Sequence, residues 1–416
     1  MKKNKKPACF AALLLAVCLC GGCGKDASAM VETKAPPLTV ESSVPTGGSG
    51  MEAGGGSSGS ESGVGDSAGA AFAEENGGME NAGAADVATE EDKTADNEND
   101  NTVTVTISAA GDVTLGNYLG QDYARSFVQT YEEEGNAYFF QNVLEYFLDD
   151  DMTIVNFEGV LTESEEIQVK DYNMKGEPEY VYILTEGSVE AVSFGNNHRL
   201  DYLAQGSRDT VDMFEEAGIA YAYDNITGIY ETKGIRIGFV SVNETSQGAG
   251  VEKYLKEGIA KLREEEEADL VIACCHWGIE REYYPEDYQK ELGHKCIDWG
   301  ADLVLGAHPH VLQGVEVYEG RFIVYSLGNF CFGANRNPSD KDTMIFRQTF
   351  TFVDGVKQED QNARVIPCSL SSVRERNDFC PTPAQDEEYT RILERINQFS
   401  EPFGVIFDEK GWYRKD

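Results

Sequence analysis

Residues 269–310 read DLVIACCHWGIEREYYPEDYQKELGHKCIDWGADLVLGAHPH, and the order of apolar runs within them indicates the class of fold. The runs at 269–275 and 301–307 are short and mostly apolar, which is typical of strands buried in a sheet. Between them, apolar side chains recur at the spacing of one helical face, at Tyr288, Leu292, Cys296 and Trp299. A strand, a helix and a second strand in this order predict an α/β domain with parallel pairing.

The same alternation continues on both sides of this stretch. Further strands are expected at 103–109, 152–157, 189–194, 235–242 and 321–327. Amphipathic helices are expected at 139–148, 203–217 and 251–262. One folded domain is therefore predicted over 102–416. Its tail, 340–416, contains a strand-like run at 344–353 and a helix-like run at 387–399, but no functional motif that we recognise.

The chain is strongly acidic, and its charge excludes some classes of partner. Its 416 residues include 73 Asp and Glu against 34 Lys and Arg, a formal net charge of -39. A nucleic-acid-binding protein needs a basic face that displaces counterions, so no nucleic-acid partner is expected. Electrostatic docking onto anionic lipid is disfavoured for the same reason.

The first 23 residues have the pattern of an export signal. Four lysines, between positions 2 and 6, precede an apolar run at 7–19 that is too short to span a bilayer, which takes about 20 residues. Gly21-Gly22-Cys23 then resembles a bacterial lipobox, although Cys20 stands where that pattern prefers Leu. We expect a lipid on Cys23 and a lipoprotein at the outer face of the bacterial cell membrane. The alternative is an ordinary signal peptide cut near 27–29.

Residues 24–101 are of low complexity, rich in Gly, Ser, Ala and acidic side chains, with almost no large apolar residue. Such a segment cannot bury enough apolar surface to offset its chain entropy. It is predicted to be a disordered spacer between the membrane and the folded domain, in preference to a binding segment.

Six cysteines follow the signal segment, at positions 274, 275, 296, 331, 368 and 380, without the CxxC spacing of a zinc ribbon. Buried free thiols are the favoured interpretation. Cys368 and Cys380 leave a disulfide across a loop as the alternative.

Polar side chains gather at the ends of five predicted strands. They are Asp112, Asn156 with Glu158, Asn197 with His198, His276, and His308 with His310. Ligands of open α/β sheets bind at the carboxyl ends of the strands. Each residue has a structural alternative, such as an Asx turn or a helix-start carboxylate. Four of the five histidines in the chain belong to this set. Together, the polar residues at the five strand ends favour a metal site.

Carboxylate, amide and imidazole donors suit Zn, Mn or Fe, and the residues do not distinguish among these metals. The His-x-His spacing directs two imidazoles to one place, and Glu158 is positioned to bridge two ions. His198 is expected to stay outside the metal shell as an acid, with Asp201 orienting it and raising its pKa.

The motifs GDVTLG, DMTIVNFEGVLT, SFGNNHRLDY, the stretch beginning HWGIEREYYPEDYQ and YSLGNFCF occur in that order over about 108–333. As a set they resemble the bacterial capsule-synthesis (CapA-type, poly-γ-glutamate) family, which is similar to the calcineurin-like metallophosphoesterases. The resemblance implies a four-layer α/β/β/α sandwich of the metallophosphoesterase type. It also implies metal ligands at Asp112, Glu158, Asn197, His276, His308 and His310, and a catalytic role for His198. Thr114 stands where phosphoesterases have a further metal His, so the resemblance implies either one or two ions.

Two functions remain open from the sequence. The first is a metal-dependent hydrolase or transferase that acts on an anionic polymer or a phosphoester, with Asn156, Glu280 and Arg281 as candidate substrate contacts. For Glu280 and Arg281, a surface ion pair is the alternative. The second function is a non-catalytic, membrane-anchored subunit of a complex that synthesises or exports capsule polymer, with a structural or vestigial metal site.

Overall fold

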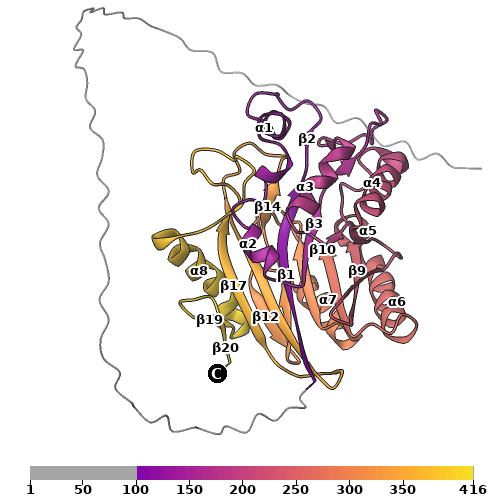
Figure 1. Ribbon diagram of the computed structural model, residues 1–416, viewed down its shortest axis with the longest axis vertical. Coiled ribbons are helices and arrows are strands. Elements are labelled where there is room, and N and C mark those ends of the chain that lie inside the picture. The colour runs from indigo at the N-terminus through magenta and orange to yellow at the C-terminus, as the bar shows by residue number, and fades with distance from the viewer. Residues whose placement is uncertain (1–100, 416) are drawn as a thin grey trace, which may run out of the picture. The chain divides into compact units, whose positions relative to one another are not determined.

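The computed structural model describes residues 101–415, which belong to one compact unit (Figure 1). The predicted signal segment, Cys23 and all but the last residue of the predicted spacer lie outside the described residues. Within 101–415, no helix combines the length and apolarity that crossing a membrane requires.

The first sheet contains the strand that starts the described chain. Its main path runs β18-β17-β15-β1-β3-β6-β7, with β14 and β16 attached at β1 and β15. Four strands pair in parallel: β1 (Thr102–Thr114), β3 (Met152–Phe157), β6 (Ala191–Ser193) and β7 (Ala220–Ala222). The tail adds antiparallel strands: β15 (Asp342–Val353), β16 (Val356–Lys357), β17 (Asn362–Ser369) and β18 (Thr382–Pro383). Parallel β14 (Asn329–Phe332) also pairs with β1.

The second sheet runs β12-β13-β11-β10-β9-β8. Its parallel strands are β9 (Ile235–Asn243), β10 (Leu270–His276), β11 (Leu303–Ala307) and β13 (Arg321–Val324). Antiparallel edge strands complete it: β8 (Gly228–Thr232) and β12 (Val315–Tyr318). The parallel β-α-β unit predicted from 269–310 is β10, α7 (Asp287–Asp298) and β11.

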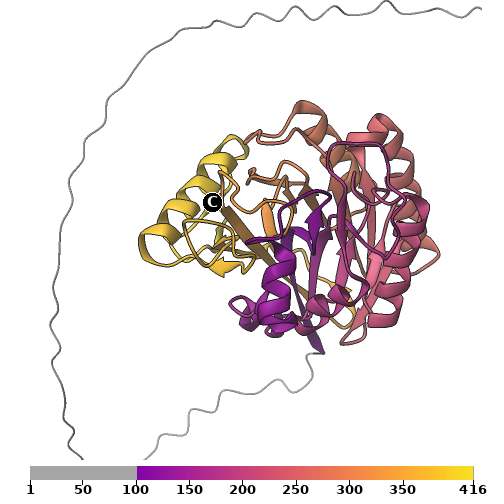
Figure 2. The same ribbon diagram turned by 90° about the horizontal axis from the view of Figure 1, so that it is seen from above.

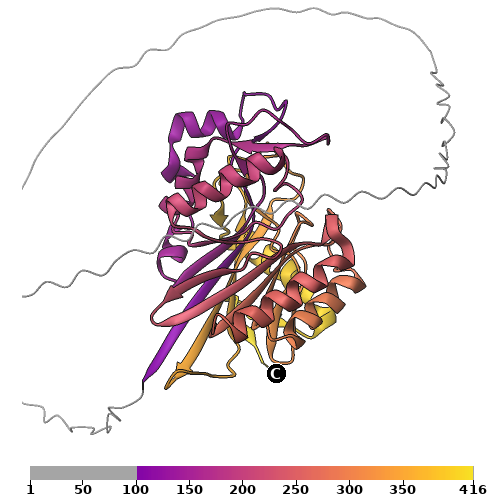
Figure 3. The ribbon, with the colours of Figure 1, turned by 90° about the vertical axis from the view of Figure 1, so that its right-hand side faces the viewer.

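Three hydrophobic clusters define four layers. The central cluster joins the inward faces of the two sheets, with Ile107 and Ile154 from the first and Phe239 and Ile272 from the second. A second cluster packs the outer face of the first sheet against helices: α1 (Phe127–Glu134), α2 (Leu144–Leu148), α3 (Val181–Glu186) and α4 (Leu203–Ala217). A third packs the second sheet against α7 and α6 (Val251–Glu264). Figure 3 shows the two sheets between these two groups of helices, so the predicted α/β/β/α sandwich is confirmed.

The tail closes one edge of this sandwich. Helix α8 (Asp386–Ser400) buries Ile392, Leu393, Ile396 and Phe399 in the central cluster, beside β17 of the first sheet and β12 of the second. Figure 2 shows α8, in yellow, along the side of the molecule. The smaller elements are β2 (Asn117–Tyr118), β4 (Val160–Leu161), β5 (Met174–Gly176), α5 (Glu244–Gln247), β19 (Ile406–Phe407), β20 (Tyr413–Arg414) and four short 3-10 helices.

One predicted helix is wrong over half its length. Of residues 139–148, only 144–148 form a helix, although Phe139, Phe140 and Val143 are buried as their spacing indicated. Residues 139–143 lie outside the helix, and within them Asn142 Nδ2 donates a 3.0 Å hydrogen bond to Thr382 Oγ1. This non-helical segment therefore contacts the distant tail. Tertiary packing can bury an apolar set without a continuous helix.

The six cysteines that follow the signal segment, all within 101–415, are buried free thiols, as favoured from the sequence. Cys368 and Cys380 are not joined, and the alternative disulfide is wrong. Each thiol is instead the donor of a hydrogen bond to a carbonyl oxygen, 3.3 Å from Cys368 to Ile366 and 3.3 Å from Cys380 to Tyr138.

Candidate metal centre

The predicted metal ligands converge where strands of both sheets end. Asp112 lies near the end of β1, Glu158 directly follows β3, and His276 is the last residue of β10. The remaining three come from loops after β6 and β11, at Asn197, His308 and His310. We call these six residues the ligand cluster. Because the parallel strands all end at the same edge, residues more than 190 positions apart face one another.

Asp112 is fixed by its backbone and by two side chains. A Cβ at Gly111 would lie 1.8 Å from the Gly328 carbonyl oxygen, so only glycine permits this approach, and Asp112 N donates to the same oxygen over 2.9 Å. Asn156 Nδ2 donates to Asp112 Oδ1 over 2.8 Å, and His310 Nδ1 lies 2.9 Å from Asp112 Oδ2. The carboxylate therefore has a defined orientation toward the cluster.

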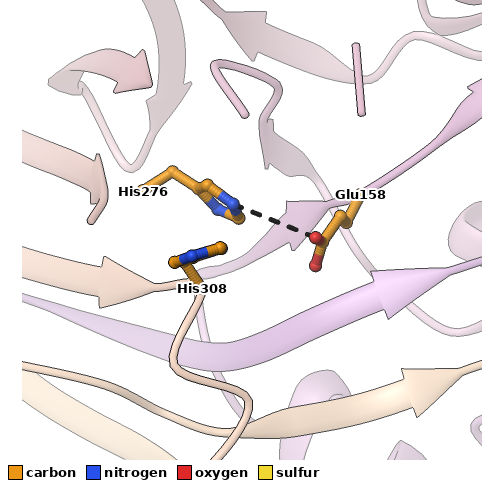
Figure 4. Close-up of side chains that lie close together, drawn as sticks. All are labelled: Glu158, His276 and His308. Atoms are coloured by element: carbon orange, nitrogen blue, oxygen red, sulfur yellow. Dashed lines mark ion pairs between the residues drawn. The ribbon is translucent and has the colours of Figure 1, made fainter. Parts of the chain in front are cut away.

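Glu158 lies at the centre of the site. It is 1% exposed, and neither carboxylate oxygen has a hydrogen-bond partner among the described residues. Its Oε1 lies 3.7 Å from Nε2 of His198 and 3.9 Å from Nε2 of both His276 and His310. Figure 4 shows the Glu158 carboxylate facing His276, with His308 beside them. Burial raises the pKa of Glu158 to about 8, against the opposing charge of His310.

The imidazoles differ in their protonation. Burial lowers the pKa of His276 well below its ordinary value and, together with the charge of His310, lowers that of His308 to about 4. Both rings are thus neutral near pH 7, the form that binds metals. Burial also acts to lower the pKa of His310, but the Glu158 and Asp112 carboxylates outweigh it and raise the pKa to about 10.

These residues fit a divalent cation. Both oxygens of Glu158 and Nδ1 of His308 are buried without a hydrogen-bond partner in the part of the chain that the structure describes, and each such buried group costs about 1–3 kcal/mol. A cation would satisfy them. Glu158 with His276 and His308, and Asp112 with Glu158 and His310, form two sets whose ligand atoms lie within 4.8 Å of one another. Because the sets share Glu158, the arrangement suits a carboxylate that bridges two ions.

Asn197 and Thr114 complete the inner site. Asn197 Oδ1 lies 3.0 Å from Nε2 of His276, close to the predicted ligands. Thr114 is 1% exposed, and its hydroxyl has no hydrogen-bond partner among the described residues. The position where phosphoesterases have a further metal His therefore holds a buried hydroxyl here.

His198 and Asp201 form the pair expected from the sequence, with 2.7 Å between Nδ1 and Oδ2. The Nε2 atom consequently lies on the side of Glu158, 3.7 Å from its Oε1, and His198 lines the cleft described below. Asp201 acts to raise the pKa of His198, as expected from the sequence, but the pKa is nevertheless below its ordinary value. Burial lowers that pKa more than the Asp201 hydrogen bond and charge raise it, and the nearby Lys170 lowers it further.

The backbone around the site adopts uncommon conformations. His308 has φ 97, His310 has φ 58 and Arg281 has φ 67, all in the left-handed region that favours glycine. Arg281 N donates a 2.8 Å hydrogen bond to the Pro309 carbonyl oxygen, which ties the two segments together. Such conformations cost of the order of 1–3 kcal/mol each and are typical of functional sites.

A cleft of about 570 Å³ opens above the cluster. The cleft is lined by His198, His310, Glu280 and Arg281. A substrate-contacting role for Glu280 and Arg281 requires this position. No ion pair joins Glu280 to Arg281 within 101–415. Asn156 does not line the cleft; it is 5% exposed and supports Asp112 instead.

Comparison with known proteins agrees with the motifs. The family model "Bacterial capsule synthesis protein PGA_cap" matches residues 106–334, more than half of the chain. The chain belongs to this capsule-synthesis family.

The chain is also similar to two Bacillus proteins. The chain is 31% identical over 254 residues to the capsule biosynthesis protein CapA of Bacillus anthracis. The aligned region covers 55% of this chain and 60% of the relative. It is 29% identical over 245 residues to the PGA biosynthesis protein CapA of Bacillus subtilis, covering 54% and 62%. The match thus spans about three-fifths of the length of each relative.

Solved structures show more distant similarity. A 5'-nucleotidase from Candida albicans aligns with a TM-score of 0.34 and 12% identity, covering 72% of this chain and 59% of that one. A purple acid phosphatase from yellow lupin aligns with a TM-score of 0.31 and 10% identity, covering 69% and 55%.

The sequence analysis of this capsule-synthesis protein did not identify two residues of the site, Asn329 and Lys170. Asn329 Oδ1 lies 2.9 Å from Nδ1 of His310, and its Nδ2 donates to the His310 carbonyl oxygen over 3.1 Å. Asn329 begins β14 and comes two residues after the strand expected at 321–327, so the strand-end rule contained the signal. Glu280, which was expected to contact substrate, also forms a possible ligand set with His308 and His310. Lys170 lies in a loop between β4 and β5 and carried no signal.

Proposed function

We propose that this protein is a divalent-metal-dependent hydrolase or transferase that acts on an anionic polymer of the bacterial capsule or cell envelope. The observation that carries the proposal is the Glu158 carboxylate, buried without a hydrogen-bond partner among the described residues and approached by three imidazoles. A merely structural carboxylate at this depth would be hydrogen-bonded. One that awaits a cation leaves its oxygens free.

The six residues of the ligand cluster would hold one or two ions. A bound divalent ion supplies Lewis acidity and lowers the pKa of water near the scissile bond. His198 acts from the cleft wall through Nε2, because its Nδ1 is held by Asp201. The lowered pKa of His198 makes its protonated form a stronger acid toward a leaving group. Asp201 fixes the ring so that Nε2 remains the atom that exchanges the proton.

The names of the relatives and the local charge support the proposed substrate class. The relatives carry the names "PGA biosynthesis protein" and, in Mycobacterium tuberculosis, "Probable polyglutamine synthesis accessory protein". An acidic chain repels a polyanion unless positive charge is available locally. In the cleft, Arg281 has no acidic partner within the described residues and supplies such a charge beside the metal ligands. A phosphoester is the alternative substrate.

The proposed location is the outer face of the cell membrane, with the domain tethered through a lipid on Cys23. The Gly21-Gly22-Cys23 motif after a basic and apolar segment supports this placement. A polymer made at the cell surface would be within reach of a domain on a long spacer.

The first test is metal content by elemental mass spectrometry on the purified full chain. We expect one or two ions in the wild type and their loss in His308→Ala/His310→Ala. His294→Ala is the matched control, because His294 lies on α7 and pairs with Glu316, away from the cluster. If the folded, metal-supplemented wild type holds no ion, the hydrolase proposal fails and a binding subunit remains.

The second part of the test separates catalysis from binding. His198→Ala should keep its metal but lose about 10²–10⁴-fold in turnover of γ-glutamyl or phosphoester substrates, the usual contribution of a general acid. Undiminished turnover, or full restoration of capsule formation by this variant, would remove the catalytic role of His198.

A further inference from the structure

A second cavity adjoins the cleft above the ligand cluster. It has a volume of about 500 Å³ and is formed by the segment between β14 and β15, the loop after β17, and α8. Ser339 and Asp340 line both hollows, so the cleft and the cavity adjoin each other at these two residues. A ligand longer than the cleft would extend into the second cavity.

Two of the cavity's cations are held in fixed orientations by a buried carboxylate. Asp342 is 6% exposed and accepts hydrogen bonds of 2.7 Å from both terminal nitrogens of Arg391. Arg395 also donates to Asp342 and, over 2.8 Å, to Asp340. Planar guanidinium groups anchored in this way retain unused donors on their outer edges.

Two further cations have no acidic partner among the described residues. Lys341 Nζ donates over 2.7 Å to Asn337 Oδ1 and over 3.1 Å to the Pro338 carbonyl oxygen, and both acceptors are neutral. Arg374 is exposed, and no hydrogen bond or ion pair holds its guanidinium within 101–415. The cavity thus combines four basic side chains with three acidic ones, Asp340, Asp342 and Glu388.

This local excess of positive charge stands in a chain of net charge -39. Within 101–415, Lys341 and Arg374 have no acidic partner, and two such cations in one hollow beside a candidate active site of a strongly acidic protein indicate an anion-binding surface. They come from separate elements and line an open cavity, which suits carboxylates spaced along a chain better than one compact phosphate group.

We propose that Lys341 and Arg374 form a subsite for the carboxylates of an anionic polymer whose neighbouring segment occupies the cleft. Arg391, which is hydrogen-bonded to Asp342, also lines this subsite. The ligand class is a chain of repeated carboxylates, such as γ-linked glutamate. The subsite fixes the register of the polymer relative to the ligand cluster. This inference rests on the proposed function for what happens in the cleft, but binding at the subsite needs no turnover.

The test is the binding of a fluorescently labelled γ-linked glutamate oligomer to the full chain at low ionic strength, followed by fluorescence anisotropy. Lys341→Ala/Arg374→Ala should raise Kd about tenfold, because charge-assisted contacts with carboxylates are lost. The matched control is Lys253→Ala/Lys256→Ala, which removes two exposed cations from α6 and leaves the cavity intact. The control should bind as the wild type does.

An equal loss in both double variants would show a net-charge effect and overturn the subsite, as would absence of binding by the wild type. Competition by inorganic polyphosphate of matched charge should be weaker than by unlabelled oligomer; stronger competition would overturn the carboxylate assignment. Repeating the titration with His308→Ala/His310→Ala separates the two proposals. Retained binding there, with loss only in the Lys341/Arg374 variant, supports the subsite even if the metal proposal fails.

Discussion

At the scale of single residues, the candidate site depends on side chains that hold others in place. Asp201 is fully buried and accepts hydrogen bonds from Met174 N and His198 Nδ1. Lys170 Nζ lies 2.5 Å from Asp201 Oδ1 and 3.0 Å from the Asn197 carbonyl oxygen. Lys170 therefore contacts the segment that carries both a predicted ligand and the predicted acid, and it balances a buried negative charge.

Replacing Lys170 should affect catalysis more than metal binding. In Lys170→Ala we expect turnover to fall about 10- to 100-fold, because partners of this kind orient the reacting groups. Metal content should be unchanged, and Lys170→Arg should restore part of the turnover. Steady-state kinetics with elemental analysis measure both quantities. Lys175→Ala is the control, since Lys175 pairs with the exposed Glu165; similar losses in both variants would contradict the role of Lys170.

At the scale of elements, α8 has a structural importance that its sequence did not reveal. It covers the open edge between the two sheets and buries four apolar side chains in the central cluster. On the same helix, Arg391 and Arg395 reach Asp342 at the start of β15. One face of α8 thus seals the core, and side chains at its border form the second cavity.

Ile396 provides the test of this packing. Ile396 is fully buried, and Ile396→Ala should lower the free energy of unfolding by about 2–5 kcal/mol, the cost of a cavity in a close-packed core. Glu394→Ala, on the exposed face of α8, should change it by less than about 0.5 kcal/mol. Urea denaturation followed by circular dichroism measures both. Equal stability of the two variants would mean that α8 is not part of the cooperative core.

At the scale of the whole molecule, net charge opposes the compact state. The excess of acidic over basic side chains gives -39 near pH 7, and repulsion among like charges destabilises a folded protein. Partly buried pairs, such as Arg391 with Asp342, are screened by salt much less than exposed charges. Salt should therefore weaken the net repulsion more than it weakens these pairs.

We accordingly expect Tm to rise when NaCl is increased from about 10 mM to about 500 mM, which shortens the screening length from about 30 Å to a few Å. Differential scanning fluorimetry at pH 7.5 measures this change. The rise should be smaller at pH 5.5, closer to the sequence pI of about 4.4, where fewer charges remain. A decrease of Tm with salt would show that local ion pairs outweigh the global repulsion.

The alternation of strands and helices, the parallel pairing and the identities of the residues at the strand ends were predictable from the sequence. Periodicity and strand-end position are local properties of the chain, so they can be read without knowledge of distant contacts. The sequence placed α4 at 203–217 and β3 at 152–157 as observed. Four features became visible only in the folded chain: the interrupted helix after residue 138, the burial of Asn156, the contact of Lys170 with Asp201, and the cavity beside α8. Each of these features depends on contacts between residues that are distant in sequence. A local sequence pattern does not specify which distant residue will bury a given side chain, pair with its charge or change its conformation.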